Sequence, residues 1–332
     1  MTWALLLCLA AQPAPPKAAL LAAEGSRLLE AGNASAARAA FEESLKLDPA
    51  RFEALHGLGF LGYAEERFDA AKGLLEKAVT VKPGSFQARF LLGAVSVRLG
   101  DNVAAIEHLR RAHSIDPSHL DARKLLAARY AAAGRHREAA ALLRPLEAAG
   151  DEESALLALE ARQGAGDSAG ALALARQAAS RFPKSARIAA WLGFQMQFAG
   201  RFDEAKPLFA RAIELDSAFG EPCRLLGEVL LKEENHAEAR GWFEKALALM
   251  PGDTETALGL AAALAGLGDP AKAVEVLAQA APARDARVHL QLSRLYFRLG
   301  DRERARQQAQ LSVQLRAENE KGRPLRPPSG VR

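Results

Sequence analysis

Along most of the chain, apolar residues recur at spacings of three and four positions, with polar and charged residues between them. Leu55, Leu58 and Leu61 follow this spacing, as do Leu91 and Val95. Such spacing places apolar side chains on one face of an α-helix, so the pattern predicts a succession of amphipathic helices. Alternating runs rich in Val, Ile and Thr do not occur in the sequence, and no β-sheet is expected.

Prolines and glycines divide the helical pattern into units of nearly constant length. Pro49, Pro83 and Pro117 lie 34 residues apart, and proline cannot continue a helix. Glycine closes a helix well because it can adopt the left-handed conformation. The glycines that follow the first helices keep the same period or a close one: Gly100, Gly134, Gly166, Gly200, Gly268 and Gly300. Together these residues predict pairs of short helices, one pair per period.

Small and aromatic residues recur at fixed positions inside these units. The clearest examples are Leu58-Gly59 with Ala71, Ala78 and Pro83, Leu92-Gly93 with Ala105, Ala112 and Pro117, Leu192-Gly193 with Ala205, Phe209 and Ala212, and Leu226-Gly227 with Ala239, Phe243, Ala246 and Pro251. This arrangement resembles the tetratricopeptide repeat family. The resemblance implies an all-α fold, a right-handed α-solenoid (superhelix) of stacked antiparallel helix pairs, with about nine units over residues 17–316. Units near Leu126-Ala127, Leu159 and Leu292-Ser293 depart from the pattern.

The two ends of the chain differ in composition from the units. Residues 1–16 contain an apolar run from Trp3 to Ala11, which is too short to span a membrane but has the length of a secretory signal peptide. This segment predicts export to the periplasm. The alternative is a cytoplasmic protein whose first helix this segment extends, or whose start codon is placed wrongly. Residues 317–332 are polar, basic and proline-rich, which predicts a disordered tail.

Charge and motif content argue against several functions. The formal net charge is +4, and most of it belongs to the C-terminal tail, so no nucleic-acid partner is expected. Gly57 to Gly62 match a dinucleotide-binding motif letter for letter, but no predicted strand precedes them. The sequence contains no metal-binding Cys or His motif and no evident catalytic set, which predicts a non-enzymatic protein without metal or cofactor. Cys223 is expected to be a small buried side chain.

In the tetratricopeptide repeat family, the first helices commonly line a concave groove that binds an extended peptide or a partner helix. The resemblance therefore implies a peptide-binding groove here, and its predicted lining is aromatic and basic: Phe60, Tyr63, Phe90, Lys124, Phe194, Phe198, Arg224, Arg294 and Phe297. Arginine beside aromatic rings is typical of interaction hot spots. The alternative for each aromatic residue is a place in the seam between adjacent units.

The predicted function is a protein–protein interaction scaffold that binds a peptide or a partner protein. The alternative is a regulatory or accessory subunit of an envelope, secretion or polysaccharide-handling enzyme complex. No stable membrane span is expected, and the sequence specifies neither the identity of the partner nor the oligomeric state.

Overall fold

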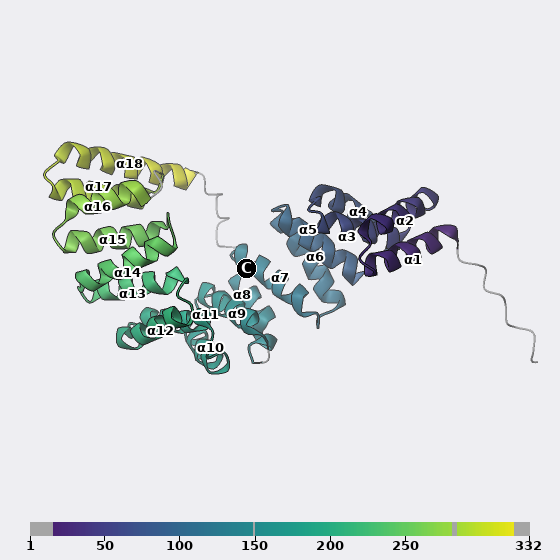
Figure 1. Ribbon diagram of the computed structural model, residues 1–332, viewed down its shortest axis with the longest axis horizontal. Helices are drawn as coiled ribbons and strands as arrows, with labels where there is room; N and C mark the ends of the chain where they lie inside the picture. Colours follow the sequence, from purple (N-terminus) through teal and green to yellow (C-terminus); the bar gives the residue numbers. More distant parts are fainter. Residues whose placement is uncertain (1–15, 149, 281–283, 322–332) are drawn as a thin grey trace, which may run out of the picture. The chain divides into compact units, whose positions relative to one another are not determined.

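The computed structural model describes residues 16–148, 150–280 and 284–321, and most of these residues are helical (Figure 1). They form eighteen α-helices and one 3-10 helix, and they contain no β-strand. The predicted all-α class is therefore confirmed. The predicted signal peptide lies outside the described residues, except for Pro16, which precedes the first helix.

The helices follow one another in pairs joined by short turns. The first four pairs are α1 (Lys17–Glu30) and α2 (Ala34–Leu47), α3 (Phe52–Ala64) and α4 (Phe68–Val81), α5 (Phe86–Arg98) and α6 (Asn102–Ile115), and α7 (Leu120–Ala132) and α8 (His136–Leu143). The 3-10 helix η1 (Arg144–Leu146) follows α8. The other pairs are α9 (Glu152–Gly164) and α10 (Ser168–Arg181), α11 (Ala186–Phe198) and α12 (Phe202–Leu215), α13 (Gly220–Lys232) and α14 (His236–Leu249), α15 (Thr254–Gly266) and α16 (Pro270–Ala280), and α17 (Ala286–Arg298) and α18 (Arg302–Lys321).

These helices form two compact units. The first comprises residues 1–150 and 160–166, and the second comprises residues 151–159 and 167–332. The sequence predicts one uninterrupted array, so this division is a departure from the expectation. It coincides with an irregular pair, because α8 has 8 residues whereas α6 has 14. Pro145 lies in η1 directly after α8, and proline cannot continue the α-helix.

Within each unit, successive pairs stack on one another. Second helices such as α4 and α14 contact both their own partner and the next first helix. First helices also contact one another in succession, as α1, α3 and α5 do in the first unit and α11, α13, α15 and α17 do in the second. We call the side of each unit that is formed by these helices its first-helix face.

Left-handed residues close the turns within the pairs. Gly100 and Gly200 both have φ of 75°, as their positions in the repeat predict. Two turns of the repeat lack the glycine, and there Glu66 and Glu234 adopt φ of 57° and 59°. An L-residue with a side chain is disfavoured in this region by about 1–2 kcal/mol, so these two turns are strained.

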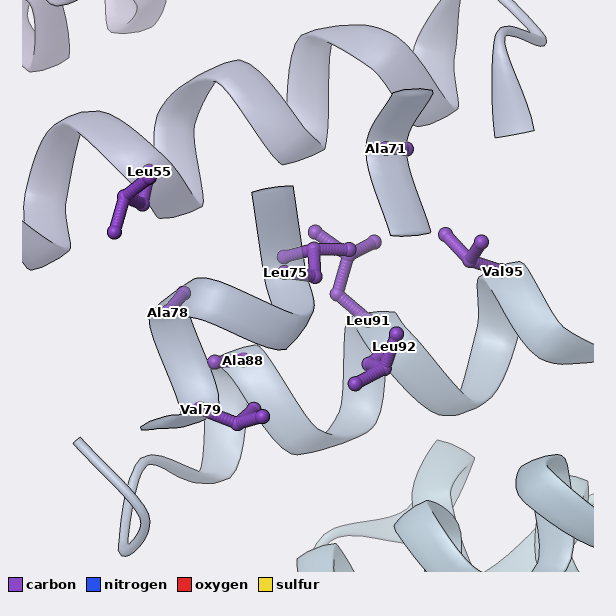
Figure 2. Close-up of a cluster of buried hydrophobic side chains, with 9 residues drawn as sticks. All are labelled: Leu55, Ala71, Leu75, Ala78, Val79, Ala88, Leu91, Leu92 and Val95. Atoms are coloured by element: carbon purple, nitrogen blue, oxygen red, sulfur yellow. The ribbon is translucent and has the colours of Figure 1, made fainter. Parts of the chain in front are cut away.

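The core of the first unit shows how neighbouring helices fit together. Figure 2 shows the buried apolar side chains that α3, α4 and α5 contribute: Leu55, Ala71, Leu75, Ala78, Val79, Ala88, Leu91, Leu92 and Val95. Leu75 of α4 lies against Gly59 of α3, where an added Cβ would be 2.7 Å from the leucine Cγ. The missing side chain at Gly59 therefore allows the close approach of the two helices.

Side-chain volumes are matched at this same position in other pairs. In the second unit, Gly193 of α11 faces the fully buried ring of Phe209 of α12. The positions 34 residues earlier, on α9 and α10, hold Leu159 and Ala175, which are also fully buried. The sizes are reversed in that pair, with the large residue on the first helix and the small one on the second. These two pairs therefore both combine a large residue with a small one, but with the large residue on opposite helices.

Helix α18 continues five residues beyond Arg316, the predicted end of the array. Ala317 and Glu318 favour helix, and Gln314 donates a hydrogen bond to Glu318 at 3.2 Å one turn later. The predicted boundary at residue 316 is therefore too early. The remainder of the predicted tail, residues 322–332, lies outside the described residues.

Candidate protein-interaction surface

A hollow on the first-helix face of the second unit lies between α11 and α13. Its volume is about 260 Å³, and it is lined by Arg187, Ala190, Trp191, Phe194, Phe219, Glu221 and Leu225. We call it the aromatic hollow. Trp191 and Phe194 meet edge to face with ring centroids 5.7 Å apart, and Phe198 continues the row 6.5 Å from Phe194. Because these three residues are three and four positions apart on α11, one face of that helix presents all three rings.

The row of rings leaves apolar surface in contact with water. Phe198 is 60% exposed, and Trp191 and Phe194 are half-buried. Removing apolar surface from water is favourable by about 25 cal/mol per Å², so a partner that covers these rings would be stabilised there. The predicted groove residues Phe194 and Phe198 therefore lie together, beside a tryptophan that the sequence analysis does not include.

On the α13 side of the aromatic hollow, the charged groups are paired within the chain. Arg224 of α13 forms ion pairs with Glu228 and with Glu221, the latter at 3.6 Å. Glu228 also accepts a hydrogen bond from Gln197 of α11 at 3.2 Å. Arg224 is a predicted groove residue, and the structure places it near the hollow with its charge already compensated. Glu228, which pairs with Arg224 and accepts the hydrogen bond from Gln197, connects α13 to α11, and Arg224 is not an unpaired cation.

In the first unit, Phe90 belongs to a second aromatic cluster. It stacks on Phe86 of the same helix with centroids 5.7 Å apart, and His119 at the start of α7 lies 5.4 Å away. His119 also lies 4.5 Å from Phe86 and accepts a hydrogen bond from the backbone N–H of Ala122 at 3.3 Å. This cluster joins α5 to α7, so Phe90 serves the packing of neighbouring first helices.

The other predicted groove residues of the first unit lie in different surroundings. Phe60 is 43% exposed on α3. Tyr63 packs edge to face on Phe68 of α4 at 5.9 Å and joins the hydrophobic cluster of Figure 2, so it occupies the seam between helices. Lys124 is only 9% exposed, and its amine is therefore not an open charge on the first-helix face.

The last two predicted groove residues, Arg294 and Phe297, lie on α17. Phe297 is 68% exposed. Both line a separate hollow between α17 and α18, which also receives Arg298. Of the five predicted residues of the second unit, Phe194 lines the aromatic hollow, whereas Arg294 and Phe297 line this second hollow. These residues therefore do not line one common groove.

Two aromatic residues that line the aromatic hollow are not among the predicted groove residues. Trp191 precedes Leu192-Gly193, and its spacing from Phe194 and Phe198 could have revealed it. Phe219 stands at the N-cap of α13, outside the helix, and no periodic pattern marks such a position.

Several titratable side chains are affected by burial. Burial lowers the pKa of His56, His108 and His113 below the ordinary value of 6.5, and nearby arginines act in the same direction on the last two. Burial raises the pKa of the thiol of Cys223, as its expected packing role requires. Within the described residues, no three His, Cys, Asp or Glu side chains come together in a way that could hold a metal ion. No described helix combines the length and the apolar character that crossing a membrane needs.

Comparison with known proteins is consistent with this architecture. A family model described as "Tetratricopeptide repeat" matches residues 28–89 and 230–289, and two others with the same description match residues 197–254 and 286–310. A model described as "Anaphase-promoting complex, cyclosome, subunit 3" matches residues 64–146. No curated protein matches the chain significantly.

Solved structures resemble the chain in fold at low sequence identity. A tetratricopeptide repeat protein from Parabacteroides merdae is 13% identical with a TM-score of 0.53, and the alignment covers 75% of this chain and 99% of that one. A chain of the APC/C hetero-tetramer Cut9-Hcn1 is 14% identical with a TM-score of 0.49, over 90% of this chain and 67% of that one.

Proposed function

Because the chain belongs to the tetratricopeptide repeat family, we propose that it is a non-catalytic scaffold that binds a peptide segment of a partner protein in the aromatic hollow of its second unit. Repeat scaffolds of this kind present extended surfaces built from equivalent helices. The family as a whole supports a protein-interaction role, and the aromatic hollow supplies a specific place for it.

The observation that carries the proposal is the row of rings formed by Trp191, Phe194 and Phe198. Tryptophan and other large aromatic residues dominate the energetics of many protein interfaces, because they bury a large apolar area with little loss of side-chain freedom. The hollow beside them, at about 260 Å³, has room for apolar side chains of a bound peptide. Leu225 and Ala190 complete an apolar wall, which favours an aliphatic or aromatic side chain as the inserted group.

Polar groups at the rim would orient the peptide. Arg187 is exposed, and the described residues provide it with no ion pair, so it is available to a carboxylate or a backbone carbonyl of the partner. The carboxylates of Glu221 and Glu228 hold Arg224 in place on the opposite side of the hollow. This arrangement combines an apolar site for affinity with one open cation for orientation.

The proposal is tested by affinity capture with the full chain as bait. A variant carrying Trp191→Ala and Phe194→Ala should recover at least about tenfold less of the specific partner than the wild-type chain. Trp242→Ala is the matched control, because Trp242 is a half-buried tryptophan on α14, a second helix, where it lies 5.2 Å from the amine of Lys245.

Helical content and the unfolding midpoint are measured for the wild-type chain, the double variant and the control. The amounts of captured partner are then compared only between proteins that are folded. If the double variant recovers the partner as well as the wild-type chain does, the aromatic hollow is not the binding site. A partner lost equally in both variants would also contradict the proposal.

A further inference from the structure

We propose that the hollow between α17 and α18 is a docking site for an acidic amphipathic helix of a partner protein. The hollow has a volume of about 650 Å³, and four of the residues that line it are arginines: Arg294, Arg298, Arg302 and Arg306. It is distinct from the aromatic hollow and belongs to the last pair of the second unit. We call it the arginine hollow.

The position of the arginine hollow corresponds to a helix-binding position in other pairs. On α14, Phe243 lies against Gly259 of the following first helix, where an added Cβ would be 2.4 Å from its ring. His236 of α14 lies against Gly266 of the same helix in the same way, with 2.6 Å to the imidazole. Phe243 and His236 therefore pack against α15, and this side of a second helix is a surface on which another helix packs.

The equivalent positions on α18, 66 residues later, hold different residues. Ala309 stands where α14 has Phe243, and Arg302 stands where α14 has His236. Replacement of a ring by a methyl group opens the floor of the hollow, which Ser293 and Ala305 complete. Phe297 stands at its edge with 68% of its surface exposed. The shape therefore suits a helix that inserts large apolar side chains beside Phe297.

The charges of the arginine hollow point to an acidic occupant. Among the residues that the structure describes, no carboxylate forms an ion pair with Arg294, Arg302 or Arg306, and Arg298 donates only to the backbone carbonyl of Ala265, at 3.3 Å. Exposed arginines on many other helices pair within their own helix or turn, and neighbouring Arg304 does so with Asp301 at 3.3 Å. Four cations left open around one hollow repel one another, and glutamates on a docked helix would relieve this repulsion.

The chain itself provides no acidic segment outside the described residues to fill this site. Residues 322–332 contain arginines and no carboxylate side chain, and residues 1–15 contain no charged side chain. Neither segment therefore matches the acidic occupant, and the proposal commits to a helix of a partner protein. A nucleic acid would also be attracted by arginine, but the hollow has the shape of a helix-packing position and its cations do not continue as a stripe along a helix.

The test uses the full chain and a fluorescein-labelled synthetic peptide that forms an amphipathic helix with a leucine face flanked by glutamates. Fluorescence anisotropy should show saturable binding of this peptide, and a control peptide with every glutamate replaced by lysine should bind at least about tenfold more weakly. Arg294→Glu with Arg306→Glu should weaken binding of the acidic peptide about tenfold or more. Circular dichroism confirms that each protein remains helical.

The matched control is Arg110→Glu with Arg137→Glu, two exposed arginines of the first unit for which the described residues provide no ion pair. This control changes the net charge by the same amount and should leave binding unchanged. Equal binding of both peptides, or equal binding by all three proteins, would refute the proposal. A labelled DNA oligonucleotide that binds more tightly than the acidic peptide would also overturn it. The proposal would also be overturned if the wild-type chain self-associates and the Arg294→Glu, Arg306→Glu variant does not, because the occupant would then be a second copy of the chain.

Discussion

Replacing Gly193 with leucine, alone and together with Phe209→Ala, tests how the helices of one pair fit together. An added Cβ at Gly193 would lie 2.7 Å from Cε1 and 2.8 Å from Cδ1 of Phe209, closer than non-bonded carbon atoms approach one another in proteins. Phe209 is fully buried, so other side chains surround its ring. The single leucine variant must therefore displace the ring or separate α11 from α12.

The expected magnitudes follow from the two kinds of packing defect. Overpacking by Gly193→Leu should destabilise the second unit by about 1–3 kcal/mol. Phe209→Ala leaves a cavity and should cost about 3–5 kcal/mol. The double variant reproduces the combination of Leu159 and Ala175 that the chain already uses on α9 and α10. Its cost should therefore be smaller than the sum of the two single costs by about 1–3 kcal/mol.

Urea denaturation followed by tryptophan fluorescence measures these costs. Of the three tryptophans of the chain, Trp191 and Trp242 lie in the second unit, so the signal of that unit can be followed. Gly241→Ala is the matched control, because Gly241 is exposed in the middle of α14 and an added Cβ there meets no atom within 4 Å. Alanine at this position should stabilise the unit by about 0.5–1 kcal/mol.

An unchanged midpoint for Gly193→Leu would refute the assigned contact between Gly193 and Phe209. If the free-energy costs of the two single variants simply add in the double variant, the stability of the pair does not depend on the combined volume of residues 193 and 209. If Gly241→Ala also lowers the unfolding midpoint, then adding a side chain destabilises the helices even where it meets no neighbour. The loss in Gly193→Leu could then not be assigned to its contact with Phe209.

Three other predictions concern the turns, the histidines and the N-terminus. Glu234→Gly should stabilise the second unit by about 0.5–1 kcal/mol in urea denaturation, because glycine adopts φ of 59° without the steric penalty. A lower unfolding midpoint for this variant would show that the turn at Glu234 is not strained. The free energy of unfolding should fall as the pH drops from about 7 to 5. Burial lowers the pKa of His56 and His113 in the folded chain, whereas both histidines keep their ordinary pKa of 6.5 in the unfolded chain. The unfolded chain therefore binds more protons in this pH range, which favours unfolding. Replacing both histidines with glutamine should make this pH dependence shallower, and an unchanged slope would exclude them as its source. If residues 1–16 are a signal peptide, N-terminal sequencing of the mature protein from a secreting host should find a start near Lys17, whereas an intact Met1 would contradict export.

The helices could be predicted from sequence because their ends are encoded locally. Turn glycines such as Gly100 and Gly200 mark the end of a first helix, and the structure shows the left-handed φ that such a turn requires. Glu66 and Glu234 interrupt the glycine pattern but not the fold, since the neighbouring pairs hold the same turn in place. Division into two units was not predictable, because it depends on how a short helix and an irregular pair affect contacts across many residues.

The candidate site was predicted only in part, because the direction of a side chain depends on its neighbours. The rings of Phe194 and Phe198 lie 6.5 Å apart on α11, as their spacing predicts, but the same reasoning assigned Tyr63 to a groove when it packs on Phe68 between helices. Lys124 is on a first helix as expected, yet it is buried there. Helical spacing defines which residues share a face, and it does not define which of them a neighbouring helix covers.

The reversed sizes of Leu159 and Ala175 limit how this chain can be recombined. A chimaera that exchanges a complete helix pair transfers both members of the large–small combination together, so the hybrid inherits a compatible interior. A chimaera joined at the turn between two helices could instead place Leu159 opposite Phe209, or Gly193 opposite Ala175. The first junction would crowd the interior and the second would leave it hollow. Viable crossovers, in evolution or in the laboratory, should therefore fall between the pairs.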